Sequence, residues 1–291
     1  MDVALPYADK MAQYGFVPMN HDKPAAFFDV GWDHVYDQKG GKIEGYKRIF
    51  REDDGRTMAL HTDAYNLVPY SVTFGAFDEA LEQSGLDTTD MQVGTDISHN
   101  GARCFRQYVL PRHEIDVRGN KLALRIIGFD SYDGSLAASI RAGAYEWACA
   151  NTSMVGKDII QLNAKHVGNM ALRVEAGIRR VIQAAEHFVS MEPRLKRWQE
   201  VTLGVEQFRD LVKMLPQATD VLLDHLTSRY AIEVDVENKN LYGAWQLLTN
   251  WSTHSEAGMR AIKANLAATK SEREKRVAAL VNHREWKLLE A

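Results

Sequence analysis

Apolar and polar residues alternate in several short segments of the first half of the chain, a pattern typical of strands with one buried face. Two such segments, 45–51 and 57–62, flank Asp53-Asp54-Gly55, and an Asp-Gly step supplies the positive φ angles that a tight hairpin turn needs. A helix of about residues 74–84, capped by Thr73, is expected to follow this hairpin. Further strands are expected over 92–97, 102–110 and 121–129.

The second half of the chain changes to a helical pattern at about Asn169, where apolar residues begin to recur every three or four positions. Beyond this first long helix, the same spacing predicts helices over 205–215, 220–229, 241–253 and 272–289. Ser271-Glu-Arg-Glu274 has the form of a capping box that would open the last of them. The small residues of 135–145 leave two alternatives open, a further strand or a helix across 142–150.

These elements predict an α+β fold, with an antiparallel sheet and one early helix followed by a mainly helical C-terminal half. The chain divides into three regions on the same grounds. Residues 1–44, which contain several prolines and the pair Gly40-Gly41, are expected to be a loop-rich N-terminal segment. Residues 45–200 would form the α+β core domain, and residues 201–291 a helical region packed on that core.

Composition is that of an ordinary globular protein. Of its 291 residues, 45% are hydrophobic and 25% are charged, and no stretch is long and apolar enough to span a membrane. The first residues lack the basic and apolar regions of a secretory signal. The two cysteines, Cys104 and Cys149, are far apart, so neither a disulfide framework nor a cysteine zinc site is expected. We therefore expect a cytoplasmic protein with no membrane partner.

Charge is distributed unevenly along the chain. Residues 1–100 carry 8 Lys and Arg against 17 Asp and Glu, a balance of −9, whereas residues 101–180 carry 12 against 7, a balance of +5. Residues 181–291 carry 15 of each, which leaves the total at −4. A basic central block is compatible with a polyanionic partner, and equally with faces that are simply solvated.

No catalytic motif accompanies these elements. The chain lacks a P-loop, a dinucleotide-binding glycine motif, a His-Glu-x-x-His zinc motif and a Gly-x-Ser-x-Gly nucleophile elbow. Acidic residues gather at Asp53-Asp54, at Asp130 and Asp133, and at Glu233, Asp235 and Glu237. In a nuclease such carboxylates would converge on Mg²⁺, but turns and exposed strands explain them as well. We expect no enzymatic activity, no cofactor and no metal.

Basic and aromatic residues interleave on two of the expected strands, 46–51 and 103–108, and alternate residues of a strand share a face. A groove for single-stranded nucleic acid needs cations for the phosphates and ring faces for the bases. The candidate phosphate contacts are Lys47, Arg48, Arg51, Arg103, Arg106, Arg125 and Lys165. The candidate stacking surfaces are Phe105 and Tyr108. The opposing interpretation is that the rings belong to the core and that edge-strand cations only discourage aggregation.

Several further motifs lie between about residue 45 and about residue 285. They are Asp63-Ala-Tyr65 with Pro69-Tyr70, Asp130-Ser-Tyr-Asp-Gly134, Cys149-Ala-Asn151, Lys165-His166-Val-Gly168-Asn169 and Asn240-Leu-Tyr-Gly-Ala-Trp245. In combination they resemble a phage and plasmid family catalogued as domain of unknown function 932. Thr152 stands where that family commonly has Gly, and Lys165 stands where it commonly has Arg.

The Lys165-His166 motif has a physical interpretation of its own. Both residues would lie in the loop that enters the helix starting near Asn169, and backbone N–H groups at a helix start favour a phosphate. Lys165 adds positive charge there, and Gly168 lets a ligand approach the backbone closely. His166 lies in the same loop and is therefore a further candidate nucleic-acid contact. The alternative is that Asn169 caps the helix while His166 packs against the sheet.

The family resemblance implies a protein of phage replication modules or conjugative plasmids. The order of elements is also similar, in topology only, to the phage single-strand annealing proteins of the RecT and Red-beta type. We therefore expect a phage or plasmid protein of replication or recombination that binds, and in the stronger hypothesis anneals, single-stranded DNA, with RNA as the alternative ligand. A homo-oligomer is expected. Two other classes stay open: a host-takeover or anti-restriction protein acting by protein contact, and a metal-dependent nuclease.

Overall fold

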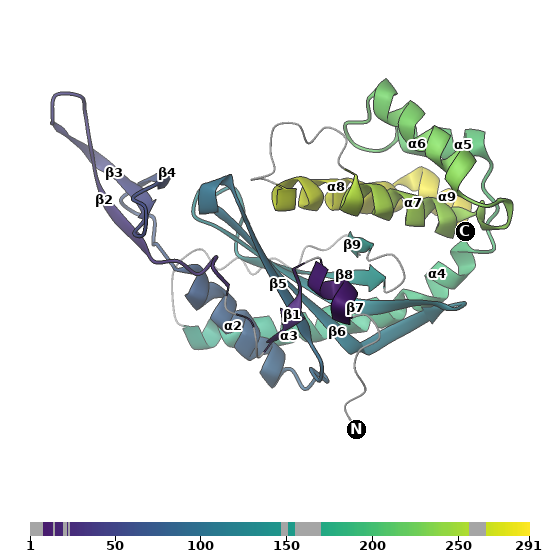
Figure 1. Ribbon diagram of the computed structural model, residues 1–291, viewed down its shortest axis with the longest axis horizontal. Coiled ribbons are helices and arrows are strands. Elements are labelled where there is room, and N and C mark those ends of the chain that lie inside the picture. Colours follow the sequence, from purple (N-terminus) through teal and green to yellow (C-terminus); the bar gives the residue numbers. More distant parts are fainter. Residues whose placement is uncertain are drawn as a thin grey trace.

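The computed structural model describes residues 8–13, 15–19, 22, 24–146, 151–154, 170–255 and 266–291. Within these residues a large antiparallel sheet has helices on both faces, and a small antiparallel sheet projects from one end (Figure 1). The strand order of the large sheet is β1-β5-β6-β7-β8-β9. Its strands are β1 (Val17–Pro18), β5 (Gln92–Ser98), β6 (Arg103–Val117), β7 (Asn120–Ser131), β8 (Ser139–Glu146) and β9 (Thr152–Met154).

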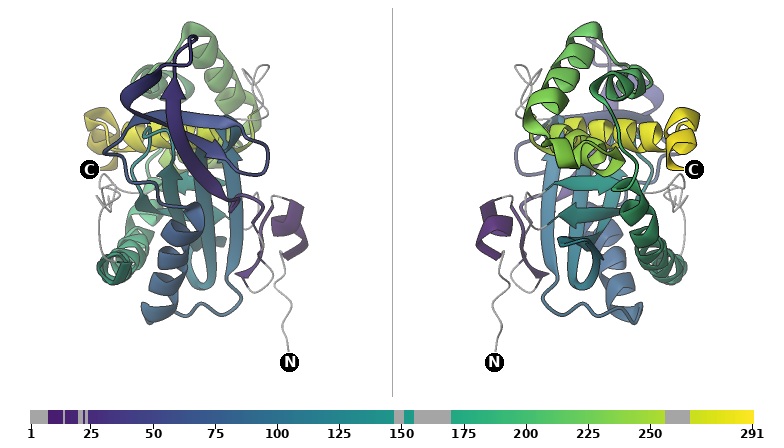
Figure 2. Two further views of the ribbon diagram at one scale, coloured as in Figure 1. Left: turned by 90° about the vertical axis from the view of Figure 1, so that its left-hand side faces the viewer. Right: turned by 90° about the vertical axis from the view of Figure 1, so that its right-hand side faces the viewer.

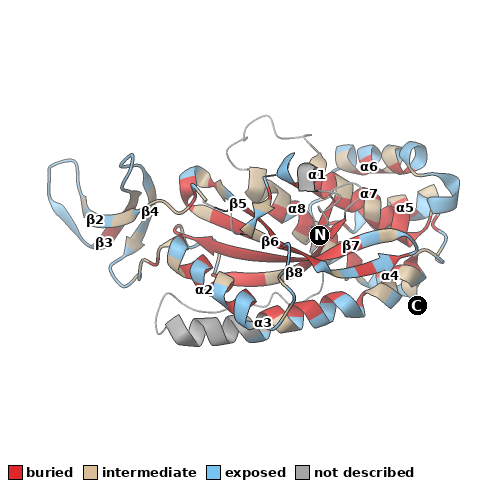
Figure 3. Ribbon diagram, turned by 60° about the horizontal axis from the view of Figure 1, so that its bottom comes forward, coloured by how far each residue is buried: buried red, intermediate tan, exposed pale blue. Residues whose placement is uncertain are grey.

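Strands β6 and β7 form the centre of the large sheet. The tight turn between them lies at Arg118 and Gly119, whose φ angles are positive, at 51° and 92°. Residues 122–131 of β7 are all buried, because helices cover both faces of the sheet at this strand (Figure 3). The sheet continues into β8, so the strand alternative for 135–145 is correct and a helix from 142 is wrong.

Helices α2 (Tyr70–Gln83) and α3 (Met170–Ser190) lie on one face of the large sheet, and α8 (Leu266–Val281) lies across the other (Figures 1 and 2). Helix α2 buries the apolar side chains of Phe74, Phe77 and Leu81 on the sheet side. It begins one turn earlier than expected, with Pro69 as the N-cap residue. Thr73 is therefore not the cap but a buried residue of the first turn.

The C-terminal half is mainly helical, and the α+β class is confirmed. Its other elements are α4 (Glu192–Trp198), α5 (Val205–Lys213), α6 (Asp220–Glu233), the 3-10 turn η3 (Val236–Asn238), α7 (Leu241–His254) and α9 (Arg284–Glu290). One hydrophobic core contains both Leu124 of the sheet and Trp198, Trp245 and Trp286 of these helices. No helix in the described part of the chain is long and apolar enough to cross a membrane.

The helix predicted over 272–289 is two helices in the structure. Helix α8 already runs at Leu266 and ends at Val281, and α9 begins at Arg284 with His283 as its N-cap residue. Ser271 and Glu274 lie inside α8 and are buried, so the capping-box interpretation is wrong. Their burial has another cause, because this part of α8 packs on β5 and β9 of the large sheet.

The projecting sheet, which we call the arm, consists of β2 (Val30–Tyr36), β3 (Lys42–Arg51) and β4 (Thr57–Thr62). The hairpin predicted at Asp53-Asp54-Gly55 is confirmed, with a φ angle of 68° at Gly55. Strand β2 lies in the segment expected to be loop-rich, as does the short helix α1 (Ala8–Gln13), so that expectation is wrong for these residues. The arm is mostly exposed (Figure 3).

Candidate nucleic-acid interface

The central strands do not present the predicted basic groove, because helices cover both of their faces. Arg106 and Tyr108 of β6 point together toward α2, as their alternation predicts, but they are only 2% and 1% exposed. The Arg106 guanidinium pairs with Asp22 and with Asp78, and the Tyr108 hydroxyl donates to Asp78 Oδ1 at 2.6 Å. A phosphate or a base could reach this pair only by displacing α2. The assignment of Arg106 and Tyr108 to nucleic-acid contact is therefore wrong.

The opposite face of the same strands lies under α8. Phe105 packs edge-on against Phe129 with ring centroids 5.7 Å apart and is 4% exposed. Arg125, also 4% exposed, lies with Nη1 2.8 Å from Glu274 Oε2 and donates from Nε to Gln107 Oε1 at 2.9 Å. Phe105 is thus no stacking surface and Arg125 no phosphate contact, contrary to the sequence-based prediction. Both are core groups that join the sheet to α8.

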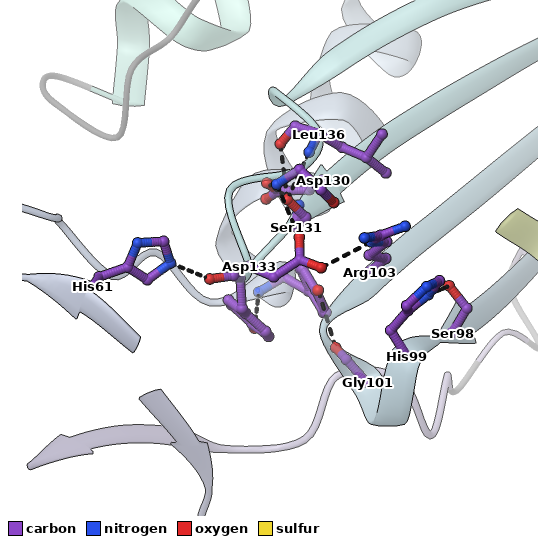
Figure 4. Close-up of polar contacts among 12 residues, drawn as sticks. His61, Ser98, His99, Gly101, Arg103, Asp130, Ser131, Asp133 and Leu136 are labelled. Atoms are coloured by element: carbon purple, nitrogen blue, oxygen red, sulfur yellow. Dashed lines mark hydrogen bonds and ion pairs between the residues drawn. The ribbon is translucent and has the colours of Figure 1, made fainter. Parts of the chain in front are cut away.

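Of the candidate phosphate contacts on the central strands, Arg103 is the one that stays near the surface. Its Nε donates to Asp133 Oδ2 at 2.8 Å, and the two side chains are 27% and 20% exposed. The pair lies at the end of the large sheet from which the arm projects (Figure 4). Lys165 and His166 lie outside the described residues.

Two of the family-like segments, the one at Tyr65 and Tyr70 and the one that begins at Asp130, meet at this end of the sheet. The backbone N–H of Tyr70 donates to the Tyr132 hydroxyl at 2.9 Å, and the two rings stack with centroids 3.9 Å apart. The Tyr65 hydroxyl donates to the Ser131 carbonyl oxygen at 3.4 Å, and His61 Nε2 lies 2.6 Å from the carbonyl oxygen of Tyr132. These contacts join the arm, the start of α2 and the end of β7, which gives the motif residues a structural role.

The short 3-10 turn η2 (His99–Gly101) lies beside Arg103 in the same cluster. His99 and Asn100 have positive φ angles of 52° and 59°, a conformation that is uncommon outside glycine and frequent at functional sites. Burial and the neighbouring Arg103 lower the pKa of His99, so its imidazole is neutral at pH 7. A neutral imidazole exchanges hydrogen bonds with a base or a sugar but adds no charge for a phosphate.

Asp133 supplies the negative charge that pairs with Arg103 in this cluster. Burial raises the pKa of its carboxyl, but hydrogen bonds from Ser135 and Arg103 outweigh burial and bring the pKa below 3.8. A carboxyl of this kind stabilises the fold above its unfolded-state pKa, and the contribution disappears as pH falls through the folded-state pKa. We therefore expect Asp133→Asn to lower the free energy of unfolding by about 1 kcal/mol at neutral pH and by progressively less at an acid pH below 3.8, as the folded-state pKa is approached. Urea unfolding at both pH values measures this difference, and an equal loss at both contradicts it.

The predicted cations of the arm are also paired. Arg48 donates to the two carboxylate oxygens of Asp33 at 2.9 and 2.6 Å, and Arg51 donates to those of Asp53 at 3.0 and 2.6 Å. Lys47 is 8% exposed and donates to the Asp63 carbonyl oxygen at 3.0 Å. The Arg48 side chain is 36% exposed, so a phosphate can compete with Asp33 without unfolding the sheet. The arm thus keeps Arg48 near solvent, whereas the central strands bury Arg106 and Arg125.

Strand β2 contributes ring-bearing side chains that the sequence analysis did not propose. Trp32, His34 and Tyr36 occupy alternate positions and share one face of the strand. Trp32 is 52% and Tyr36 is 59% exposed. Lys47 Nζ lies 5.2 Å from the Trp32 ring centroid, and Lys42 pairs with Tyr36 across the sheet. We call these five residues the arm face.

Four members of the acidic clusters pair with neighbouring arginines. Asp53 pairs with Arg51, Asp54 with Arg56, Asp133 with Arg103 and Glu233 with Arg229. Among the residues that the structure describes, no group of three or more His, Cys, Asp or Glu is arranged to hold a metal ion. This part of the chain therefore offers no geometry that favours the nuclease alternative.

Comparison with known proteins supports the family resemblance. The family model described as domain of unknown function (DUF932) matches residues 58–281. No curated protein and no solved structure matches the chain, so the topological similarity to single-strand annealing proteins stays a prediction. The matched residues include α2, most of the large sheet and the helices through α8, well over half of the chain. The chain therefore belongs to the DUF932 family.

Proposed function

We propose that the protein binds single-stranded nucleic acid, DNA in the first place, along the arm face and does not cleave it. The observation that supports this proposal is the row of exposed rings on β2, with Lys42 and Lys47 beside it. Alternate residues of a strand are about 6.6 Å apart. Trp32 and His34 pack edge to face with ring centroids 5.6 Å apart, so the exposed rings of Trp32 and Tyr36 are the stacking surfaces. Base stacking on such rings is sequence-tolerant, and Lys42, whose side chain is 36% exposed, supplies charge for a phosphate.

Stacking rather than charge supplies most of the affinity in this proposal. Residues 30–62 contain six Lys and Arg and six Asp and Glu, so the arm carries no net formal charge. Counterion release is correspondingly small when few phosphates are neutralised. A stacked base contributes about 1–3 kcal/mol as measured by alanine substitution. The proposal thus differs from the basic groove expected on the central strands, whose cations are mostly buried.

An arm that holds single strands suits the replication or recombination of a phage or plasmid in the host cytoplasm, including the annealing of complementary strands. Within the small sheet of the described chain, β2 and β4 are edge strands. Edge strands offer unpaired backbone groups to a neighbouring copy. Assembly of several copies of the protein along one nucleic-acid strand is therefore part of the proposal.

Trp32→Ala and Tyr36→Ala are each expected to weaken binding of a fluorescein-labelled oligo-dT by about 5-fold or more, because each removes a stacking surface. The double variant should bind about 100-fold more weakly. Fluorescence anisotropy at one fixed salt concentration measures the dissociation constants. Leu60→Ala is the matched control: Leu60 is 61% exposed on the same arm but pairs with Arg48 on the opposite face. It should bind as the wild type does.

Three results would count against the proposal. Unchanged binding in the double variant would move the nucleic-acid site away from the arm face. A wild-type protein that binds neither oligo-dT nor oligo-rU would overturn nucleic-acid binding and leave the protein-contact alternative, which capture of a specific host protein would then support. Strand cleavage that EDTA abolishes would overturn the non-hydrolytic part of the proposal.

A further inference from the structure

A cavity of about 60 Å³ lies between α8 and the face of the large sheet that α8 covers. Since one water molecule takes about 10–15 Å³ of such a space, the cavity has room for about four non-hydrogen atoms. Its wall on the sheet side is mainly apolar and includes the packed side chains of Phe105, Ile127 and Phe129. The cavity therefore suits a small molecule with an apolar part.

One face of α8 closes the cavity. The residues of α8 that line it are Ala267, Lys270, Ser271 and Glu274. They recur every three or four positions, so they lie on one side of the helix, toward the sheet. The sheet contributes the charged side chains of Asp96 and Arg125 to the same lining. The formal charges of the lining therefore cancel, since Lys270 and Arg125 face Asp96 and Glu274.

The charged groups other than Lys270 are used within the protein. Arg125 Nη1 lies 2.8 Å from Glu274 Oε2. Asp96 Oδ2 accepts a hydrogen bond from Gln107 Nε2 at 3.4 Å. Within the described chain, the Lys270 amine makes neither a hydrogen bond nor an ion pair, although the charge of Asp96 acts on it. The amine is thus the charged group of the lining that is available to a ligand.

The surroundings of Lys270 favour the neutral amine. Burial lowers the pKa of this amine and outweighs the carboxylates of Asp96 and Glu274, and the charges of Arg125 and Arg273 act in the same direction as burial. A neutral amine has a free electron pair and is a nucleophile, whereas an ammonium group is not. The Lys270 side chain is only partly buried, so a small molecule can reach it.

We propose that Lys270 forms a Schiff base with a small uncharged aldehyde held in this cavity. The electron pair of the nitrogen attacks the carbonyl carbon and forms the C–N bond. The carbonyl oxygen then takes up both amine hydrogens and leaves as water while the C=N bond forms, so the step consumes no oxidant and no reductant. The apolar wall accommodates the alkyl part of the aldehyde. A charged ligand would lose its hydration there without gaining an unpaired opposite charge.

Reductive trapping of the full chain with propanal and sodium cyanoborohydride at pH 7 tests the proposal. The reductant converts the imine to a stable secondary amine, so peptide mass spectrometry shows which lysine formed it. Lys270 should be labelled about 5-fold faster or more than Lys275, which lies on the same helix and pairs with Glu272. Hexanal has the same reactive group but more atoms than the cavity can hold. It should label Lys270 more slowly than propanal does and label Lys275 equally fast.

A variant that fills the cavity tests its part in the reaction. Ala267→Leu should slow the labelling of Lys270 by propanal by about 5-fold or more, because the longer side chain takes the space of the aldehyde. Ala279→Leu is the matched control, because Ala279 is exposed on the same helix and does not line the cavity. It should be labelled as the wild type is. Circular dichroism checks the fold of both variants.

Equal labelling of Lys270 and Lys275 by propanal would overturn the proposal. Labelling of Lys270 that is as fast with hexanal as with propanal, or that Ala267→Leu leaves unchanged, would place the reaction on the open surface and overturn the cavity site. The Trp32→Ala variant should be labelled at Lys270 as the wild type is, so failure of this proposal and failure of nucleic-acid binding are distinguishable.

Discussion

Replacing Arg106 with methionine is expected to lower the free energy of unfolding by about 3–5 kcal/mol. The guanidinium is 2% exposed and lies between two carboxylates, those of Asp22 and Asp78. It also donates to Thr95 Oγ1 at 2.8 Å and to the Tyr108 hydroxyl oxygen at 3.0 Å. Methionine fills a similar volume but leaves the carboxylates without their cation in a poorly solvated site. Chemical denaturation followed by circular dichroism measures the loss.

Arg112→Met supplies the control on the same strand. Arg112 also pairs with an aspartate, Asp90, but the two side chains are 51% and 37% exposed. Such an exposed pair contributes at most about 1 kcal/mol. If Arg106→Met and Arg112→Met lost equally little stability, the Arg106 pairs would be solvated and Arg106 would again be a candidate phosphate contact. A large loss for Arg106→Met alone confirms a structural role, and any loss of nucleic-acid binding in that variant would then reflect unfolding.

Local pattern was enough to predict the strands and which side chains share a face. The turn at Arg118 and Gly119 joins β6 to β7 as expected, and Phe105 and Arg106 do point to opposite faces. The α+β class followed from the same patterns. Each of these features depends on residues close together in the chain, where backbone geometry and side-chain alternation act directly.

Local pattern could not predict what covers each face. Arg106 meets Asp78 across 28 positions and Asp22 across 84, and Arg125 meets Glu274 across 149. No spacing rule connects residues so far apart, so a basic strand that is exposed and one that is buried between helices look alike in sequence. The sequence analysis therefore took Arg106 and Arg125 as available to a phosphate, although each of them pairs with a distant acid.

The arm face was missed for a different reason. Trp32, His34 and Tyr36 alternate as strand residues do, and this signal was present in the sequence. Prolines before the strand and Gly40-Gly41 after it favoured a loop assignment. The glycines instead belong to the β2–β3 turn, where Gly40 has a φ angle of 82° and Asp37 accepts the backbone N–H of Gly41 at 2.8 Å.

Replacing Glu274 with alanine is expected to lower the free energy of unfolding by about 3–5 kcal/mol and to loosen α8 from the large sheet. Glu274 is 2% exposed, and its Oε2 lies 2.8 Å from Nη1 of Arg125, itself 5% exposed as a side chain. Its other oxygen accepts the Thr152 hydroxyl at 2.6 Å, so one carboxylate ties α8 to both β7 and β9. Alanine leaves the Arg125 charge without its carboxylate inside the protein and removes one hydrogen-bond partner of the Thr152 hydroxyl. Urea unfolding gives the stability, and hydrogen exchange of the α8 amides shows whether that helix opens first.

Glu272→Ala is the matched control, because Glu272 lies on the same helix with its side chain 64% exposed and pairs with Lys275. It should lose less than about 1 kcal/mol. The double variant Arg125→Met with Glu274→Leu should recover most of the loss, since a buried ion pair replaced by apolar groups of similar size is often neutral or stabilising. A double variant as unstable as Glu274→Ala would contradict the buried-charge explanation, because removing Arg125 would then relieve nothing. The loss would have to come from the Thr152 hydrogen bond and from packing of α8 on the sheet.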